Sequence, residues 1–208
     1  MCIRDRDPDL AEPFNKLAAE RYTVHMGRTV TSATEGSEGV TLTLDDGTTV
    51  SSESLLIATG RIPNSDTLDV AAAGIETHEG GRVAVDEFGR TSVDGVWSLG
   101  DLSSPYQLKH VANAEQRAVT HNVLQAWAGN DDSTMVPMPH EHVPSAIFTH
   151  PQIATVGLTE QEAVDAGFDV TVKLQNYGDV AYGWGLEDST GVVKLCLLYT
   201  SPSPRDRT

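Results

Sequence analysis

The residue whose position most strongly suggests chemistry is Asp101. It follows the mostly apolar run "GVWSLG" at residues 95–100, and a second apolar run, "SLLIATG", ends at Gly60. Both runs read as strands that end in glycine. At the carboxyl edge of an open α/β sheet, glycine lets the backbone approach a nucleotide, and an aspartate can accept hydrogen bonds from sugar hydroxyls.

The longest predicted helix begins shortly after Asp101. Residues 106–129 carry apolar residues at helical spacing and end at Gly129, a residue type that commonly terminates helices. The predicted apolar face consists of Leu108, Val111, Ala112, Ala118, Val119, Val123, Leu124 and Trp127. The start of the helix near Gln107 would offer unpaired N–H groups and a positive dipole end to an electron-rich ligand atom. Each motif is weak alone, but together they predict a nucleotide site.

The remaining patterns predict the elements that would position this site. The first half should contain a helix at 7–22, strands at 22–26 and 28–34, a hairpin at 39–52 that turns at Asp46–Gly47, and a buried parallel strand at 54–60. Short antiparallel strands should flank the Phe88–Gly89 turn, followed by a buried strand at 95–101. After a linker at 129–142, strands at 143–149, 152–157, 168–175, 179–184 and 191–195 and a helix at 159–167 predict an α+β region.

Composition restricts the class of partner. The 208 residues include 14 Lys and Arg against 30 Asp and Glu, a formal charge of -16, which argues against nucleic-acid or anionic-membrane binding. No apolar run reaches the roughly 18 residues of a membrane span. Two cysteines in a chain of this length favour a reducing compartment, so we expect a cytoplasmic protein.

Both cysteines lie in stretches that look foreign. "MCIRDR" at the start can be encoded by a sequence whose reverse complement encodes Cys-Leu-Leu-Tyr-Thr and opens a serine codon, and the tail reads "CLLYTS" from Cys196. The two ends therefore resemble opposite strands of one sequencing-library adapter. We expect residues 1–6 and 196–208 to be artefacts and the segment between them to be a fragment of a longer protein.

Four stretches carry a family resemblance. "LLIATGRIPN", "RTSVDGVWSLGD", "QLKHVANAEQRAVTHNVL" and "VPSAIFTHPQIATVGLTEQEA" occur in the order found in the flavin-dependent pyridine-nucleotide disulfide oxidoreductases. "SSPYQLKHVAN" and "YGDVAYGWGLEDSTGVVKL" look most like the mycothione reductases within that family. The resemblance covers residues 7–195. It implies an α/β fold in which 7–62 end a Rossmann-like NAD(P) domain, 63–128 return to the FAD domain, and 143–195 form half of an α+β dimerisation domain.

The resemblance also implies roles for single residues. Asp101 corresponds to the aspartate that hydrogen-bonds the ribityl chain of FAD. Gln107, Leu108, Lys109 and His110 correspond to the turn whose backbone meets the pyrimidine edge of the flavin, and Gly60 lies beside the nicotinamide cofactor. The implied cofactors are FAD and NADPH, or NADH. The implied partners are a low-molecular-weight disulfide, for which the resemblance favours mycothiol disulfide, and a second copy of the chain through residues 143–195 and a missing C-terminal part.

Other interpretations remain open. Within the enzyme class, dihydrolipoamide dehydrogenase and mercuric or glutathione reductase compete, and the redox-pair and C-terminal regions would separate them. A non-catalytic flavin-binding or dimerisation module is the alternative from another class. The "HEH" of residues 140–142 resembles a metal motif, but loop histidines beside prolines are far commoner than ligands, so we expect no metal site.

We expect the 208-residue chain by itself to be catalytically inactive, with no catalytic residue of its own. The family passes hydride from NAD(P)H to FAD and on to a Cys-x4-Cys pair, helped by a C-terminal histidine–glutamate pair. The sequence contains no such cysteine pair and no G-x-G-x-x-G. An assay of NADPH oxidation with a disulfide substrate should give the rate of the buffer control. Turnover by the purified chain would contradict the prediction.

Overall fold

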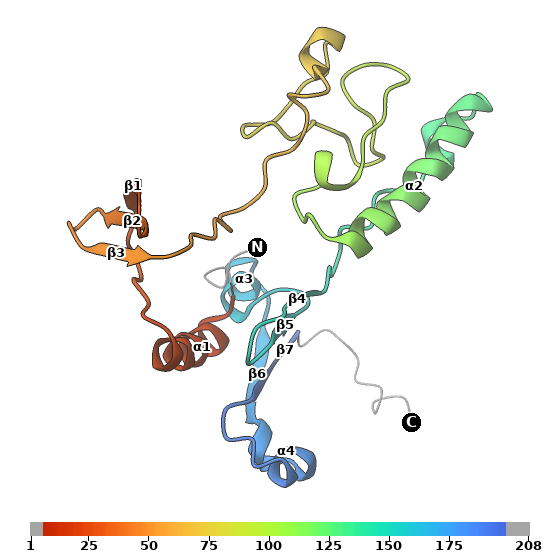
Figure 1. Ribbon diagram of the computed structural model, residues 1–208. Coiled ribbons are helices and arrows are strands. Elements are labelled where there is room, and N and C mark those ends of the chain that lie inside the picture. The colour runs from red at the N-terminus through yellow and green to blue at the C-terminus, as the bar shows by residue number, and fades with distance from the viewer. Residues whose placement is uncertain (1–5, 199–208) are drawn as a thin grey trace, which may run out of the picture. The chain divides into compact units, whose positions relative to one another are not determined.

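The computed structural model describes residues 6–198, which belong to two compact units. One unit contains residues 11–60, and the other contains residues 6–10 and 61–198. The helices are α1 (Pro8–Arg21), α2 (Lys109–Trp127), α3 (Glu160–Asp165) and α4 (Ala181–Gly185) (Figure 1). The strands are β1 (Val30–Gly36), β2 (Gly39–Leu44), β3 (Thr49–Ser52), β4 (Ser145–Ile147), β5 (Ile153–Thr155), β6 (Val170–Asn176) and β7 (Val192–Leu198). Short 3-10 helices are η2 (Val70–Ala73), η3 (Gly100–Leu102), η4 (Asp132–Thr134) and η5 (Tyr177–Asp179). Within the described range, no helix is both long and apolar enough to cross a membrane.

The unit of residues 11–60 contains an antiparallel sheet in the order β1-β2-β3. The predicted hairpin turn is confirmed: β2 and β3 pair with Thr43 opposite Thr49, and Gly47 has a φ of 84°. The Thr48 N–H donates to Asp46 Oδ1 at 2.9 Å, and the hydrogen bonds from Thr48 hold the pKa of Asp46 below its ordinary value. The hairpin therefore forms from local turn chemistry.

Three long strand runs predicted before residue 102 do not form, at 22–26, 54–60 and 95–101. Residues 22–26 and 54–60 are irregular, and Leu56 and Ile57 are 87% and 74% exposed. A buried parallel strand needs hydrogen-bonded neighbours, whereas every strand pairing among residues 6–198 is antiparallel and joins strands adjacent in sequence. Residues 95–101 make only the single bridge between Arg90 and Trp97, because Gly100 turns into the left-handed region with a φ of 68° and starts η3.

Helix α2 organises the unit that contains residues 61–198. The prediction of a helix over this stretch is confirmed, and Gly129 follows it with a φ of 73°. The buried residues of α2 are Val111, Glu115, Ala118, Val119 and Asn122, whereas Leu124 and Trp127, expected on the apolar face, are 55% and 82% exposed. The face that α2 buries thus combines apolar and polar side chains.

The predicted turn at Phe88–Gly89 packs on α2. Gly89 donates its N–H to the Asp86 carbonyl at 3.1 Å and has a φ of 90°. A Cβ at Gly89 would lie 2.6 Å from Val119 Cγ2, so only glycine fits between this turn and the helix. The strands predicted around the turn are reduced to isolated bridges, Thr77 with Val83 and Arg90 with Trp97.

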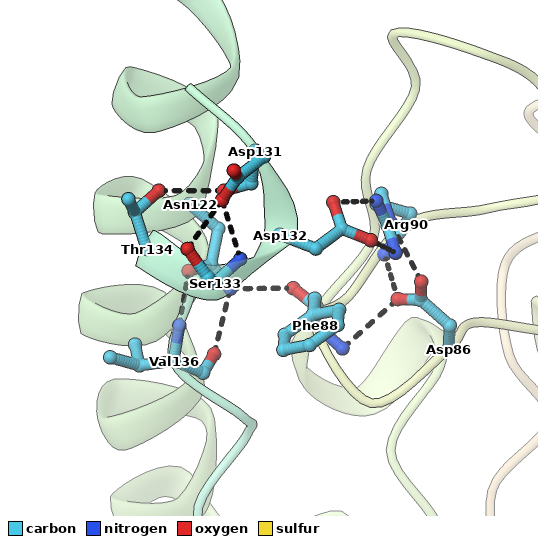
Figure 2. A network of polar contacts seen from close by, with 9 residues as sticks. All are labelled: Asp86, Phe88, Arg90, Asn122, Asp131, Asp132, Ser133, Thr134 and Val136. Atoms are coloured by element: carbon cyan, nitrogen blue, oxygen red, sulfur yellow. Dashed lines mark hydrogen bonds and ion pairs between the residues drawn. The ribbon is translucent and has the colours of Figure 1, made fainter.

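Residues 129–142, predicted to be a linker, lie along α2. The Asn122 side chain is fully buried and donates to the carbonyls of Phe88 at 3.0 Å and Val136 at 2.8 Å. Its Oδ1 accepts the Val136 N–H at 2.9 Å. Figure 2 shows the second connection, in which Arg90 donates to both carboxylate oxygens of Asp132 at 2.8 and 3.0 Å. Asn122 therefore fastens the turn and the following segment to the helix, and Arg90 joins these two segments to each other.

The last part of the chain is built from two hairpins. β4 pairs with β5, and β6 pairs with β7 in a register that sets Asn176 opposite Val192. The Thr159 hydroxyl and the Glu162 carboxylate form a reciprocal capping box at the start of α3, where a helix is predicted. The strand predicted at 179–184 is wrong: because Asn176 and Val192 close the β6–β7 hairpin, residues 177–191 form its connection, which contains η5 and α4.

Lys194 of β7 connects this region to the start of α1. Its side chain is 7% exposed, and its Nζ lies 2.9 Å from Asp7, 2.7 Å from Asp9 and 2.7 Å from Glu160. Burial opposes the charge of Lys194, but the three carboxylates outweigh it and hold its pKa well above the ordinary value.

Replacing Asp86 with asparagine should change how stability depends on pH. Partial burial opposes ionisation of Asp86, but hydrogen bonds from Arg90 and from the Phe88 N–H outweigh it and hold its pKa below 3.8. A lowered pKa contributes stability above the unfolded-state value, and this contribution is lost as the pH falls through the folded-state value. Because the side chain is 38% exposed, Asp86→Asn should lower the free energy of unfolding by only about 0.5 kcal/mol at pH 7.

Urea unfolding followed by circular dichroism between about pH 7 and pH 3 measures this effect, because the wild-type chain should lose more stability over that window than Asp86→Asn. Asp94→Asn, an exposed carboxylate in the same region, is the matched control and should parallel the wild type. If the free energy of unfolding fell equally for Asp86→Asn and the wild type between these pH values, the lowered pKa of Asp86 would be contradicted.

Candidate functional site

The predicted site residues divide between the two units. Gly60 is the last residue of the unit of residues 11–60, and its φ of 135° lies where L side chains are rarely found. Asp101 and the four residues 107–110 belong to the other unit. The structure therefore brings five of the six predicted site residues into one unit.

Asp101 lies in a turn that presents its carboxylate to solvent. Gly100 is buried, and its carbonyl accepts the N–H groups of Ser103 at 3.0 Å and Ser104 at 2.7 Å. The Asp101 side chain is 53% exposed, and its Oδ2 lies 3.3 Å from the Arg61 guanidinium, which is 69% exposed. An exposed ion pair of this kind is worth little, so the Asp101 oxygens are accessible to other hydrogen-bond donors.

The start of α2 is polar and uncapped. Leu108 precedes the helix in an extended conformation, and no side chain caps the first turn. The first N–H groups of any helix lack acceptors within the helix, and the dipole adds positive potential at this end. Gln107 adopts a φ of 50°, the left-handed region that non-glycine residues rarely occupy. The left-handed conformation of Gln107 turns the chain just before the start of α2.

A cavity of about 970 Å³ adjoins the helix start. Leu108, Lys109 and His110 line it, together with residues of β4, β5 and α3. His110 Nε2 lies 2.9 Å from the Pro144 carbonyl, which fixes the ring at the cavity wall. The cavity therefore adjoins the residues at the start of α2, whereas Asp101 and Gln107 do not line it.

The aspartate turn and the helix are in direct contact. A Cβ at Gly100 would lie 3.5 Å from the Cβ of Ala112, and the Gly100 N–H donates to Glu115 Oε2 at 2.7 Å. The turn that carries Asp101 therefore rests on the first two turns of α2. The exposed carboxylate of Asp101 and the start of α2 thus belong to two segments that contact each other through Gly100.

Two residues of this arrangement were not predicted. Glu115 is fully buried, and His140 Nε2 lies 2.6 Å from its Oε1. His140 belongs to the "HEH" stretch considered as a metal motif; among the described residues, no group of three or more potential ligands could hold a metal ion. The sequence does contain a signal for Glu115. This residue lies four positions from both Val111 and Val119, so a charged side chain occupies the buried face of the helix.

Gln107→Gly should stabilise the chain. Glycine adopts the left-handed region without strain, so relief of strain should exceed the extra entropy of the unfolded chain and raise the free energy of unfolding by up to about 1 kcal/mol. The control is Gln116→Gly in the interior of α2, which should lower the free energy of unfolding by about 1 kcal/mol. Chemical unfolding of the three proteins measures both changes. Equal destabilisation by the two substitutions would contradict the strain at Gln107.

Comparison with known proteins identifies the family. A family model described as pyridine nucleotide-disulphide oxidoreductase matches residues 2–118, and the model of the dimerisation domain of that family matches residues 143–200. Mycothione reductase of Mycobacterium tuberculosis is 50% identical over 193 residues, covering 93% of this chain and 41% of the relative. A dihydrolipoyl dehydrogenase of Halobacterium salinarum is 35% identical, with 79% of this chain and 34% of the relative covered.

The fold agrees with that family. The crystal structure of LpdA from Mycobacterium tuberculosis matches with a TM-score of 0.79 at 25% identity, covering 93% of this chain and 41% of that chain. The chain thus spans about two fifths of the length of the mycothione reductases it matches. Because the two family matches together cover residues 2–118 and 143–200, the chain belongs to the pyridine nucleotide-disulphide oxidoreductase family.

Proposed function

We propose that this chain is part of a homodimeric, FAD-dependent enzyme that reduces mycothiol disulfide with NAD(P)H. The observation that carries the choice of substrate is the 50% identity with mycothione reductase over nearly the whole chain. The observation that carries the flavin site is the contact between the Gly100–Asp101 turn and the uncapped start of α2.

The described residues fit FAD in two respects. Asp101 has an exposed carboxylate that can accept hydrogen bonds from the ribityl hydroxyls. The backbone of Gln107, Leu108, Lys109 and His110 would meet the pyrimidine edge, where the N–H groups and dipole of α2 favour negative charge. When bound, FAD would supply hydride acceptance from NAD(P)H and electron transfer to a disulfide. Asp101 and residues 107–110 would bind and orient it.

The nicotinamide cofactor would approach near Gly60. A φ of 135° and the open space at its Cβ position among the described residues support a close backbone approach there. NADPH is the favoured donor, with NADH as the alternative.

The proposed dimer interface is residues 143–195. Phe148 and Trp184 are 84% and 77% exposed in this region, and aromatic side chains of this kind are enriched at interfaces. We propose the same domain order as the resemblance implies: an NAD(P) segment at 7–62, an FAD segment at 63–128 and a dimerisation segment at 143–195. A cytoplasmic location is consistent with reduction of a low-molecular-weight disulfide.

Dihydrolipoyl dehydrogenase activity is the second candidate, favoured by the relative at 35% identity. The lower identity makes it the weaker of the two. Lipoamide and mycothiol disulfide differ in size and polarity, so a direct comparison of the two substrates separates the candidates.

The test begins with sequencing of the source DNA through both ends of this reading frame, followed by purification of the complete encoded protein. We expect a dimer with bound flavin that oxidises NADPH in the presence of mycothiol disulfide and much more slowly with lipoamide. Asp101→Asn should weaken FAD binding by about ten-fold, since it removes a charged acceptor, while the exposed control Asp94→Asn should not. A purified protein that neither retains nor binds FAD would overturn the proposal.

A further inference from the structure

Glu115 is a buried carboxyl group with two partners from different segments. It is fully buried on α2, where its Oε2 accepts the Gly100 N–H at 2.7 Å and its Oε1 lies 2.6 Å from His140 Nε2. Burying a carboxyl group is costly unless its oxygens are hydrogen-bonded. One side chain therefore joins the turn before Asp101, the helix and residue 140.

His140 extends this connection to the other end of the same loop. Its ring packs edge-on against Tyr106 with centroids 5.2 Å apart, and the Tyr106 hydroxyl donates to the His140 carbonyl at 3.1 Å. The His140 N–H in turn donates to the Met138 carbonyl at 2.9 Å. Tyr106 immediately precedes Gln107, so the Glu115–His140 pair is connected to both ends of residues 100–107.

We propose that Glu115 and His140 are positioning residues of the flavin site: together they fix residues 100–107, which carry Asp101 and lead into the start of α2. This inference rests on the proposed flavin function. Neither residue touches the ligand; each acts through the backbone that presents Asp101 and Gln107. No residue of the "HEH" stretch needs a metal for this role.

The contacts of Glu115 with Gly100 and His140 are better suited to fixing the position of residues 100–107 than to raising the overall stability of the fold. Replacing both members of a buried pair with apolar side chains is often neutral for stability, so a pair of this kind is not needed for stability alone. An apolar side chain at position 115 could fill the space of Glu115. It could not accept the Gly100 N–H, which would be left without a partner in the buried turn. The carboxyl group thus controls where the turn lies on the helix.

Amide hydrogen exchange on the full 208-residue chain without flavin tests the first part. In Glu115→Met, the Gly100 amide should exchange about ten-fold faster, because it loses a hydrogen bond to a charged group. Glu115→Gln keeps an oxygen that can accept the Gly100 N–H and should retain protection within about three-fold. Gln116→Met, one position along and exposed, is the matched control and should not change the Gly100 rate.

Titration of the same proteins with FAD, followed by quenching of flavin fluorescence, tests the second part. Glu115→Met and His140→Leu should each raise the FAD dissociation constant by about ten-fold, whereas Glu115→Gln and Gln116→Met should stay within about three-fold of the wild type. The double variant should bind no more weakly than the weaker single variant, because the two residues act as one unit.

The outcomes separate the inference from the proposed function. If Asp101→Asn weakens FAD binding but Glu115→Met and His140→Leu do not, the positioning role is wrong and the flavin site stands. If the wild-type chain and its complete parent protein do not bind FAD, the proposed function fails and the positioning role falls with it. An unchanged Gly100 exchange rate in Glu115→Met would overturn the inference whatever the flavin result.

Discussion

The need to satisfy buried backbone polar groups governs the unit that contains residues 61–198. Residues 61–108 contain no strand longer than a single bridge, so they have few ladder hydrogen bonds available. Helix α2 supplies partners from its side: Glu115 accepts the Gly100 N–H, and Asn122 binds backbone groups of Phe88 and Val136. Both side chains are fully buried. An irregular region is thus held in one conformation by polar side chains of a regular element.

The elements that were predictable from sequence are those that depend on local chemistry. The hairpin at Asp46–Gly47 needs only turn residues and alternation, and α2 needs only an apolar face and a terminating glycine. The run at 54–60 has equally strong strand character, yet Leu56 and Ile57 are exposed and unpaired. A parallel strand depends on neighbours distant in sequence, which its own residues cannot specify.

The candidate site shows the same division. A strand-like run, a glycine and a helix start in order predict Asp101 and the helix start near Gln107, whereas Leu108, Lys109 and His110 were added by the family resemblance. Glu115 and His140 were missed because their contact joins residues 25 apart across a segment interpreted as a linker. The i, i+4 row of Val111, Glu115 and Val119 contained the evidence: a carboxyl group in a buried row needs a partner, although sequence alone does not say which one.

The exposed run at 54–58 affects how the chain behaves at high concentration. Its side chains between Ser54 and Thr59 carry no charge, and its backbone pairs with no strand, which makes it a template for strand addition by another molecule. The formal charge of -16 opposes such encounters by mutual repulsion between chains. Salt shortens the range of that repulsion to within about 10 Å at 0.1 M. The tendency of this chain to self-associate should therefore depend on ionic strength. Low salt preserves the repulsion between molecules, and high salt weakens it so that the 54–58 runs of two molecules can pair.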